Sequence, residues 1–170
     1  MRRANLESTL VAIAVIAAAN FVAFIIAAIT AGSLSNTTSS FEIRDGGLFG
    51  PSVEDHGEWW RVVTSGFLHI SWEHFFSNML ALLVLGLLLG NALGAARFAA
   101  IYLGSLVAGG LFVLLFSPDS LTVGASGAVF GLAGAGLVVA WRQRRWLFLI
   151  LVVGWAVTNL LFTISTPGIS

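Results

Sequence analysis

Long apolar runs separated by polar segments make up most of this chain. The runs cover five ranges: about Leu10 to Ile29, Trp72 to Leu93, Phe98 to Phe116, Ser126 to Ala140 and Leu147 to Thr163. A helix that crosses a bilayer needs about 17 to 25 predominantly apolar residues, and only the fourth run is shorter than that. The pattern predicts an all-α polytopic membrane protein, with five transmembrane helices in these 170 residues.

The first apolar run follows two arginines, Arg2 and Arg3. A secretory signal peptide begins in the same way, but its apolar core has only about 7 to 15 residues. The longer run therefore predicts a retained transmembrane helix, with cleavage as the less favoured alternative. On this interpretation residues 1–9 form a cytoplasmic N-terminus and residues 10–170 a transmembrane domain.

The longest polar segment, from Thr30 to Trp60, lies between the first two apolar runs. It contains turn signals at Gly46-Gly47 and Gly50-Pro51, and it ends in two adjacent tryptophans beside Arg61. Tryptophan next to charged residues is typical of the membrane interface. A loop of this length is usually functional or disordered. Further along, directly before the second apolar run, Ser71 is the predicted N-cap of the second helix.

Composition supports the membrane assignment and limits the chemistry. The chain is 58% hydrophobic and 9% charged, against about 25% charged residues in soluble domains. It contains no cysteine, which excludes disulfides, a thiol nucleophile and a cysteine metal site. His69 and His74 are five residues apart, with no acidic residue at ligand spacing on one face, so no metal site is expected. The formal charge of zero predicts no net attraction to nucleic acid.

Charges are distributed unevenly between the two ends of the predicted helices. With the N-terminus in the cytoplasm, six of the eight arginines lie on the inner side, at positions 2, 3, 97, 142, 144 and 145. Seven of the eight acidic residues then lie on the outer side. This arrangement satisfies the positive-inside rule with one consistent alternation of five helices. We therefore expect a multi-pass protein with a cytoplasmic N-terminus.

A serine, Ser126, stands where a polar loop becomes the fourth apolar helix. A hydroxyl there points from the positive end of a helix dipole, which stabilises developing negative charge. His74 and Asn78 share one face of the second helix, and polar side chains at that depth usually face a bundle interior or a wet cavity. The alternatives are that the glycines around Ser126 only allow helix packing, and that His74 and Asn78 only join helices by hydrogen bonds.

The short fourth helix also predicts a recessed site. It is about 22 Å long against a hydrocarbon core of about 30 Å, so its N-terminus should lie below the outer surface, in a water-filled cavity open to the outside. Asn78 and Ser126 then lie within about one helical turn of the same level. A serine nucleophile needs a base within hydrogen-bond reach, and His74 is not easily both base and oxyanion donor.

Two sets of glycines are spaced for the close approach of another helix. One set lies on the second helix and the other on the fourth: Gly86, Gly90 and Gly94, and Gly127, Gly131 and Gly134.

From about Glu58 to its end, the chain resembles the rhomboid family of intramembrane serine proteases. The matching pieces are Trp60-Arg61, the ordered set His69, His74 and Asn78, and Gly124-Ala125-Ser126-Gly127 at the start of the fourth helix. A G-x-S-G motif alone is weak, but the ordered set at the family's spacing is specific. The family fold is a six-helix bundle, so the resemblance implies that five of its six core helices are present here.

The resemblance implies a serine–histidine dyad without an aspartate, in which Ser126 is the nucleophile. It implies an oxyanion hole formed by His74, Asn78 and backbone N–H groups near Ser126. Family substrates are single transmembrane segments, cut near the outer membrane face, and no cofactor is used. The implied location is a bacterial plasma membrane, with the active-site cavity open to the outer side.

Supporting roles follow from the same resemblance. Arg61 shapes the outer loop, which lies partly in the membrane, and His69 supports the start of the second helix. Gly124 keeps the loop before the serine open. Independently of the resemblance, the lack of side chains at Gly124 and Gly127 allows close backbone approach. Phe130 stands where the family usually has a tyrosine that stacks on the catalytic histidine.

The resemblance also shows what this sequence lacks. The family's general-base histidine lies on a sixth helix, but no histidine follows His74 and the sequence ends at Ser170. We therefore expect a rhomboid-type serine endopeptidase truncated before the sixth helix and inactive as it stands. The glycine face of the fourth helix should then lack its partner. The alternatives are a pseudoprotease that binds transmembrane clients and a small transporter or packing subunit; the oligomeric state is left open.

Overall fold

The computed structural model describes residues 2–165 and is helical through most of that range. The elements are α1 (Arg2–Ala31), α2 (Phe41–Gly46), α3 (Gly50–His56), α4 (Arg61–Thr64), the 3-10 helix η1 (Ser65–Phe67), α5 (Trp72–Leu93), α6 (Ala95–Phe116), α7 (Ser126–Arg142) and α8 (Trp146–Ser165). The five long helices correspond to the five apolar runs, so the predicted all-α fold is confirmed. Residues 1 and 166–170 lie outside the described residues.

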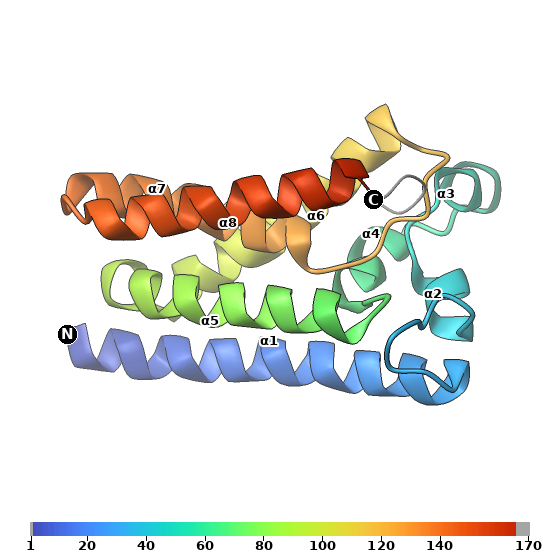
Figure 1. The fold of residues 1–170 in the computed structure, drawn as a ribbon, viewed down its shortest axis with the longest axis horizontal. Helices are drawn as coiled ribbons and strands as arrows, with labels where there is room; N and C mark the ends of the chain where they lie inside the picture. The colour runs from blue at the N-terminus through green and yellow to red at the C-terminus, as the bar shows by residue number, and fades with distance from the viewer. Residues whose placement is uncertain (1, 166–170) are drawn as a thin grey trace.

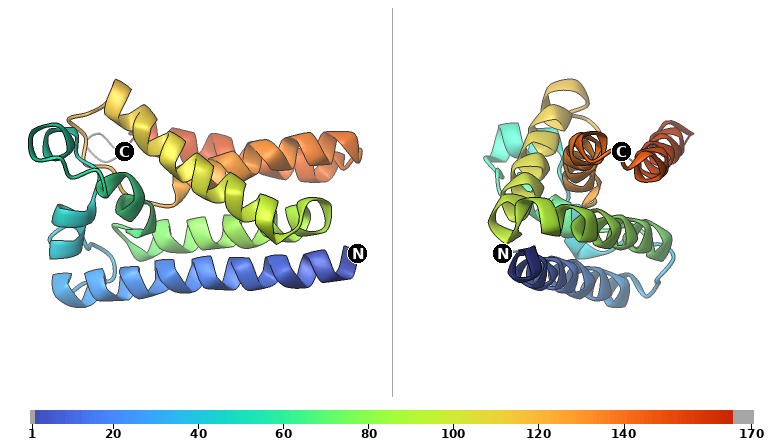
Figure 2. Two further views of the ribbon diagram at one scale, coloured as in Figure 1. Left: turned by 180° about the vertical axis from the view of Figure 1, so that it is seen from behind. Right: turned by 90° about the vertical axis from the view of Figure 1, so that its left-hand side faces the viewer.

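The long helices form a bundle in which α7 is central. The short helices α2, α3 and α4 gather at one end, and the N-terminus lies at the other, together with the α5–α6 and α7–α8 turns (Figure 1). Viewed end-on, α7 lies between α6 and α8 (Figure 2), and it packs against both of them and against α5. The helix that begins with Ser126 is therefore surrounded on several sides by the others.

Three helices contain stretches long and apolar enough to cross a bilayer: Leu6–Ala31, Trp72–Gly90 and Ala95–Phe116. Two further apolar stretches, Ser126–Arg142 and Trp146–Thr158, are shorter. Large apolar side chains cover the outside of the bundle, including Val15, Leu115 and Ile150. Such a surface suits lipid, because helices satisfy their backbone hydrogen bonds internally. The protein is a multi-pass integral membrane protein.

Two helix boundaries differ from those predicted. α1 begins at Arg2 and so runs through the residues expected to precede the first helix. The second and third apolar runs leave residues 94–97 between them, but Gly94 alone separates α5 from α6. Its φ of 75° provides the sharp turn, which residues with a Cβ rarely adopt. Because the connection is so short, α5 ends and α6 begins at the same end of the bundle.

The segment between the first two long helices is folded. The Ser40 hydroxyl accepts a hydrogen bond from the Ile43 N–H at 3.1 Å and caps α2. Apolar side chains from α2, α3 and the link between them are fully buried: Ile43, Leu48 and Val53. Sequence reasoning expected a loop that is functional or disordered, and the structure shows an ordered cap over one end of the bundle.

The glycines of α5 face α1, as their spacing predicts. A Cβ at Gly90 would lie 3.1 Å from the Thr9 Cβ, and a Cβ at Gly86 would overlap the Ile13 side chain. The absence of side chains at these two glycines therefore lets the side chains of α1 pack directly against α5. Gly94 serves the turn to α6, so the expected packing role holds for the first two positions only.

The expectation that the glycine face of α7 lacks a partner is wrong for two of its three positions. A Cβ at Gly127 would lie 3.7 Å from the Gly109 Cα, and a Cβ at Gly131 would overlap the Ser105 side chain. Both contacts are with α6, because small residues on each helix let their backbones approach. Only Gly134 faces open space. The prediction assumed that the family's sixth transmembrane helix is the partner of this face. In the structure α6, which is the third long helix of this chain, already covers it at Gly127 and Gly131.

Candidate active site

Ser126 opens α7 at the inner end of a loop that is anchored at two points. The backbones of Leu48 and Thr122 exchange hydrogen bonds of 2.9 and 2.8 Å. The Gly124 N–H then donates to the Ser65 carbonyl at 2.9 Å. Figure 1 shows this loop running inward from the end that carries α3 to the start of α7. The start of α7, and with it the serine, therefore lies inward of the end that carries α3 (Figure 1).

His74 lies against the residues that precede Ser126. A Cβ built at Gly124 would be 2.8 Å from His74 Nε2 and 3.7 Å from Ser126 Oγ. Gly124 has φ +123°, which residues with a side chain rarely adopt. The imidazole can approach only because this position has no side chain. The structure thus brings together His74 and Ser126, which are far apart in the sequence.

The start of α5 fixes where His74 points. The Ser71 hydroxyl accepts a hydrogen bond from the His74 N–H at 3.3 Å, so the predicted N-cap is confirmed. His69 packs its ring edge against His74, with 5.1 Å between ring centroids. The Thr37 hydroxyl donates to the His69 carbonyl at 2.7 Å and holds this segment in place. Residues 32–71, which link α1 to α5 and which we call the outer segment after the side expected from the charge distribution, therefore help to position the histidine.

His69 lies before the spanning stretch of α5 and is fully buried. Burial, and to a lesser extent the charge of a protonated His74, lowers the pKa of His69 to about 3. The ring is therefore neutral at physiological pH. Its place behind His74, away from solvent, fits packing support rather than proton exchange with substrate.

Asn78 lies one helical turn beyond His74 on the same face of α5. Its side chain is buried, and its amide nitrogen donates to the His74 carbonyl at 3.0 Å. An amide nitrogen carries two hydrogens, so one donor of Asn78 is engaged within its own helix and a second remains. The first turn of α7 adds backbone N–H groups, which have no acceptor within the helix.

A cavity of about 350 Å³ adjoins the serine on the side that faces α6. Ser126, Gly127 and Phe130 line it from α7, and Gly109 and Phe112 line it from α6. Its lining is mostly apolar, with the hydroxyl of Ser126 among the few polar groups. Space for a reacting group therefore exists beside the serine.

Phe130 does not stack on a histidine among the described residues. Its ring lies 5.2 Å from that of Trp155 on α8. Trp155 is a site neighbour that sequence reasoning missed, because an aromatic residue within a long apolar run gives no distinguishing signal. The contact ties α8 to the helix that carries the serine.

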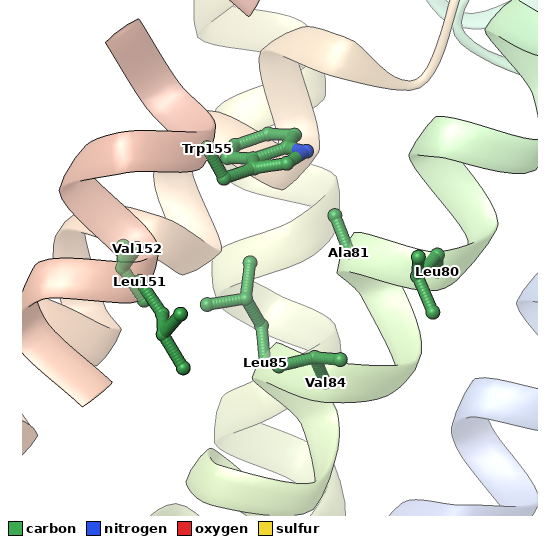
Figure 3. A pocket seen from close by; sticks show the side chains of 7 residues that line it. All are labelled: Leu80, Ala81, Val84, Leu85, Leu151, Val152 and Trp155. Carbon is green, nitrogen blue, oxygen red and sulfur yellow. The ribbon is translucent and has the colours of Figure 1, made fainter. Parts of the chain in front are cut away.

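A second, wholly apolar groove lies between α5 and α8. It has a volume of about 220 Å³ and opens to the outside of the bundle. Figure 3 shows its lining from the two helices: Leu80, Ala81, Val84, Leu85, Leu151, Val152 and Trp155. Trp155 borders this groove and also touches Phe130, so the groove lies one side chain away from the serine's helix.

Arg61 joins the outer segment to the bundle. Its guanidinium donates to the carbonyls of Arg44 and Gly47, at 2.9 and 2.7 Å, and pairs with the Glu58 carboxylate. The arginine is buried, so these three partners offset the cost of removing its charge from water. Arg61 thus ties the outer segment to the bundle. Sequence analysis did not predict its ion pair with Glu58, although the two residues are only three positions apart.

The remaining histidine, His56, is exposed at the end of α3. Within residues 2–165 no group of three or more histidine or acidic side chains is placed to hold a metal ion. The polar groups that the structure gathers at this site are those of Ser126, His74, Asn78 and the backbone around them.

Comparison with known proteins identifies the family to which this sequence belongs. A family model described as the Rhomboid domain matches residues 56–170, which include both the α5 motif and the Ser126 loop. The chain belongs to the rhomboid family. No solved structure matches the chain.

Curated rhomboid proteins match about half of the chain. Rhomboid protease GluP of Bacillus subtilis is 42% identical over 94 residues, which is 55% of this chain and 18% of that protein. Putative rhomboid protease YdcA of Bacillus subtilis is 40% identical over 83 residues, 48% of this chain and 42% of that protein. Inactive RHOMBOID-like protein 8 of Arabidopsis thaliana is 36% identical over 92 residues, 54% of this chain and 26% of that protein. The matches thus span less than half the length of these relatives, and they include an inactive rhomboid protein.

Proposed function

We propose that this chain forms the core of an intramembrane serine endopeptidase that cleaves transmembrane segments of membrane proteins. One observation carries the proposal: the His74 imidazole lies against Gly124, beside Ser126, at the N-terminus of the central helix. A nucleophile and a hydrogen-bond donor then meet inside the bundle, where the low dielectric strengthens their interaction with a developing oxyanion.

In this proposal Ser126 Oγ attacks the carbonyl carbon of the scissile peptide. The carbonyl oxygen becomes an oxyanion that accepts hydrogen bonds from His74, from the second amide hydrogen of Asn78 and from the backbone at the start of α7. Removal of one such donor typically slows an enzyme by about 10²- to 10³-fold. Gly124 keeps the loop open and Arg61 holds the outer segment above it.

We assign no residue of the 170 as the general base. His69 is buried and neutral, and His74 serves as the oxyanion donor, so neither is free to accept the proton of Ser126. We infer that the base reaches the serine from a helix outside the present sequence. The cavity beside Ser126 and the open face at Gly134 are where such a helix would pack. The 170-residue chain alone is then inert.

The substrate enters from the bilayer in this account. The groove between α5 and α8 is wholly apolar and suits the side of a transmembrane segment. The charge distribution supports a cytoplasmic N-terminus at residues 1–9 and a site that opens to the outer side, and the two bacterial relatives support a bacterial plasma membrane. The proposed chemistry needs no cofactor.

A second candidate is a pseudoprotease that binds transmembrane clients without cutting them. The similarity to an inactive rhomboid protein and the unassigned base favour it. The two candidates differ in the reactivity of Ser126. A fluorophosphonate probe should add its mass to the peptide that contains Ser126 in the chain extended beyond Ser170 by its reading frame. Labelling that is absent in this longer chain, while a transmembrane client still binds, would support the pseudoprotease.

A further inference from the structure

The turn between α7 and α8 carries three arginines. α7 ends at Arg142, α8 begins at Trp146, and Arg144 and Arg145 lie between them. All three arginines are exposed. None of the three guanidinium groups pairs with a carboxylate in the part of the chain that the structure describes. We call residues 142–145 the basic turn.

The backbone of the basic turn is that of a Schellman motif, a common helix ending. The Arg145 N–H donates to the Ala140 carbonyl at 2.9 Å, and the Arg144 N–H donates to the Trp141 carbonyl at 3.1 Å. The left-handed position of this motif is usually glycine, because a Cβ is strained there. Here it is Arg144, with φ 54°, the one non-glycine residue with positive φ within residues 2–165.

The strain at Arg144 indicates that its side chain has a use. A glycine would complete the same two backbone hydrogen bonds at lower conformational cost. Residues held in sparsely populated backbone regions are concentrated at binding and active sites. The chain instead has an arginine, Arg144, at the strained position, and this adds a third guanidinium group to those of Arg142 and Arg145.

Two tryptophans flank the basic turn and place it at a defined depth. The rings of Trp141 and Trp146 meet edge to face, with 5.4 Å between centroids. They remain 65% and 54% exposed, so neither is packed into the bundle. Exposed tryptophans on a membrane protein lie at the boundary between acyl chains and headgroups. The guanidinium groups are therefore at the level of lipid phosphates.

We propose that the basic turn binds the phosphate headgroups of anionic phospholipids. Guanidinium groups recognise phosphate oxygens through paired N–H donors, and a cluster of them adds attraction to a negatively charged leaflet. Phosphatidylglycerol carries a net negative charge, whereas the choline of phosphatidylcholine offsets its phosphate. Bound headgroups hold the α7–α8 hairpin, and with it the helix of Ser126, at a fixed depth. This inference does not depend on the proposed proteolytic function.

Arg97 offers a matched control for charge alone. It is exposed near the start of α6, whose first turn lies at the same end of the bundle (Figure 1). It lies on a regular helix, with neither a strained backbone nor a pair of flanking tryptophans. Neutralising Arg97 removes the same charge from the same end without touching the basic turn.

The test measures the thermal unfolding midpoint of the full chain in zwitterionic detergent. The protein is titrated with phosphatidylglycerol, with phosphatidylcholine or with inorganic phosphate. Phosphatidylglycerol should raise the midpoint of the wild type and of Arg97→Gln by several degrees, because a ligand that binds the folded state stabilises it. Phosphatidylcholine and inorganic phosphate should leave both midpoints unchanged.

Two variants probe the basic turn. Arg144→Gly relieves the backbone strain, so it should fold with a higher midpoint without lipid and yet lose about half or more of the shift caused by phosphatidylglycerol. The variant with glutamine at positions 142, 144 and 145 should lose the shift. The proposal is overturned if both variants keep the wild-type shift, if Arg97→Gln loses as much as the triple variant, or if inorganic phosphate alone reproduces the shift.

Discussion

His74 Nε2 would lie 2.8 Å from a Cβ at Gly124, closer than real side chains approach each other. The same point is 3.7 Å from Ser126 Oγ. The backbone of residue 124 is therefore the surface on which the imidazole rests beside the serine. The left-handed φ of Gly124 and the absence of its side chain together set the geometry of the site.

Gly124→Ala should remove the reactivity of Ser126 with a fluorophosphonate probe in the extended chain. The added methyl group displaces the imidazole, and the backbone conformation is strained for any residue but glycine. Gly104→Ala is the control, since Gly104 is helical in α6 and faces open space. It should leave labelling intact and raise the free energy of unfolding by about 0.5–1 kcal/mol. Equal labelling of both variants would contradict the assigned contact.

Gly131→Ala should destabilise the contact between α6 and α7. Its Cβ would overlap the Ser105 side chain, and overpacking of this kind costs about 1–3 kcal/mol. Replacing Ser105 with glycine in the same chain should recover most of the loss, because it removes the overlapping atoms. Chemical or thermal unfolding in detergent measures both changes. If Ser105→Gly gives no recovery, the packing of these two helices has been assigned wrongly.

Arg61→Ala should loosen the outer segment while the long helices stay folded. The change leaves the carbonyls of Arg44 and Gly47 and the Glu58 carboxylate without their shared donor, at a cost of about 2–3 kcal/mol. Hydrogen exchange should therefore speed up in residues 41–57 and change little in α7. Arg44→Ala is the control. The Arg44 side chain is exposed, and the substitution keeps the backbone carbonyl that accepts the hydrogen bond from Arg61.

The buried His69 should make stability fall as the pH drops. Its pKa is about 3 in the folded protein against 6.5 for a free side chain, so the folded state binds fewer protons. The ring is neutral in both states above pH 6.5 and adds no pH dependence there. Between 6.5 and 3 the unfolded state gains a proton that the folded state excludes, which lowers the free energy of unfolding by up to about 1.4 kcal/mol per pH unit.

His69→Gln checks this assignment, because it removes the titrating group and keeps hydrogen-bonding capacity. Unfolding of the wild type and of His69→Gln should be compared between pH 7 and pH 4. The variant should show the shallower dependence. The same slope in both proteins would mean that other groups cause the pH dependence.

Hydrophobic periodicity and length predicted the five long helices, because run length in a membrane protein is fixed by the thickness of the bilayer. The pairing of His74 with Ser126 followed from the ordered motif and from the shortness of α7. The partner of Gly131 could not be predicted in the same way. Small residues signal close packing, but they do not say which of several apolar helices approaches.

The same limit applies to the outer segment and to Phe130. The folded cap depends on long-range bonds from Arg61 to carbonyl groups, which have no sequence signature. The ring contact between Phe130 and Trp155 joins two apolar runs with no distinguishing residue in either. Local caps such as Ser71 were predictable because their chemistry lies within a few residues.

Cleavage of a transmembrane substrate in liposomes tests the central claim most directly. The chain extended beyond Ser170 by its reading frame is compared with the same chain carrying Ser126→Ala. If Ser126 is the nucleophile, the unaltered chain cuts the substrate within or next to its transmembrane segment and the alanine variant does not. Cleavage that survives Ser126→Ala would contradict the account.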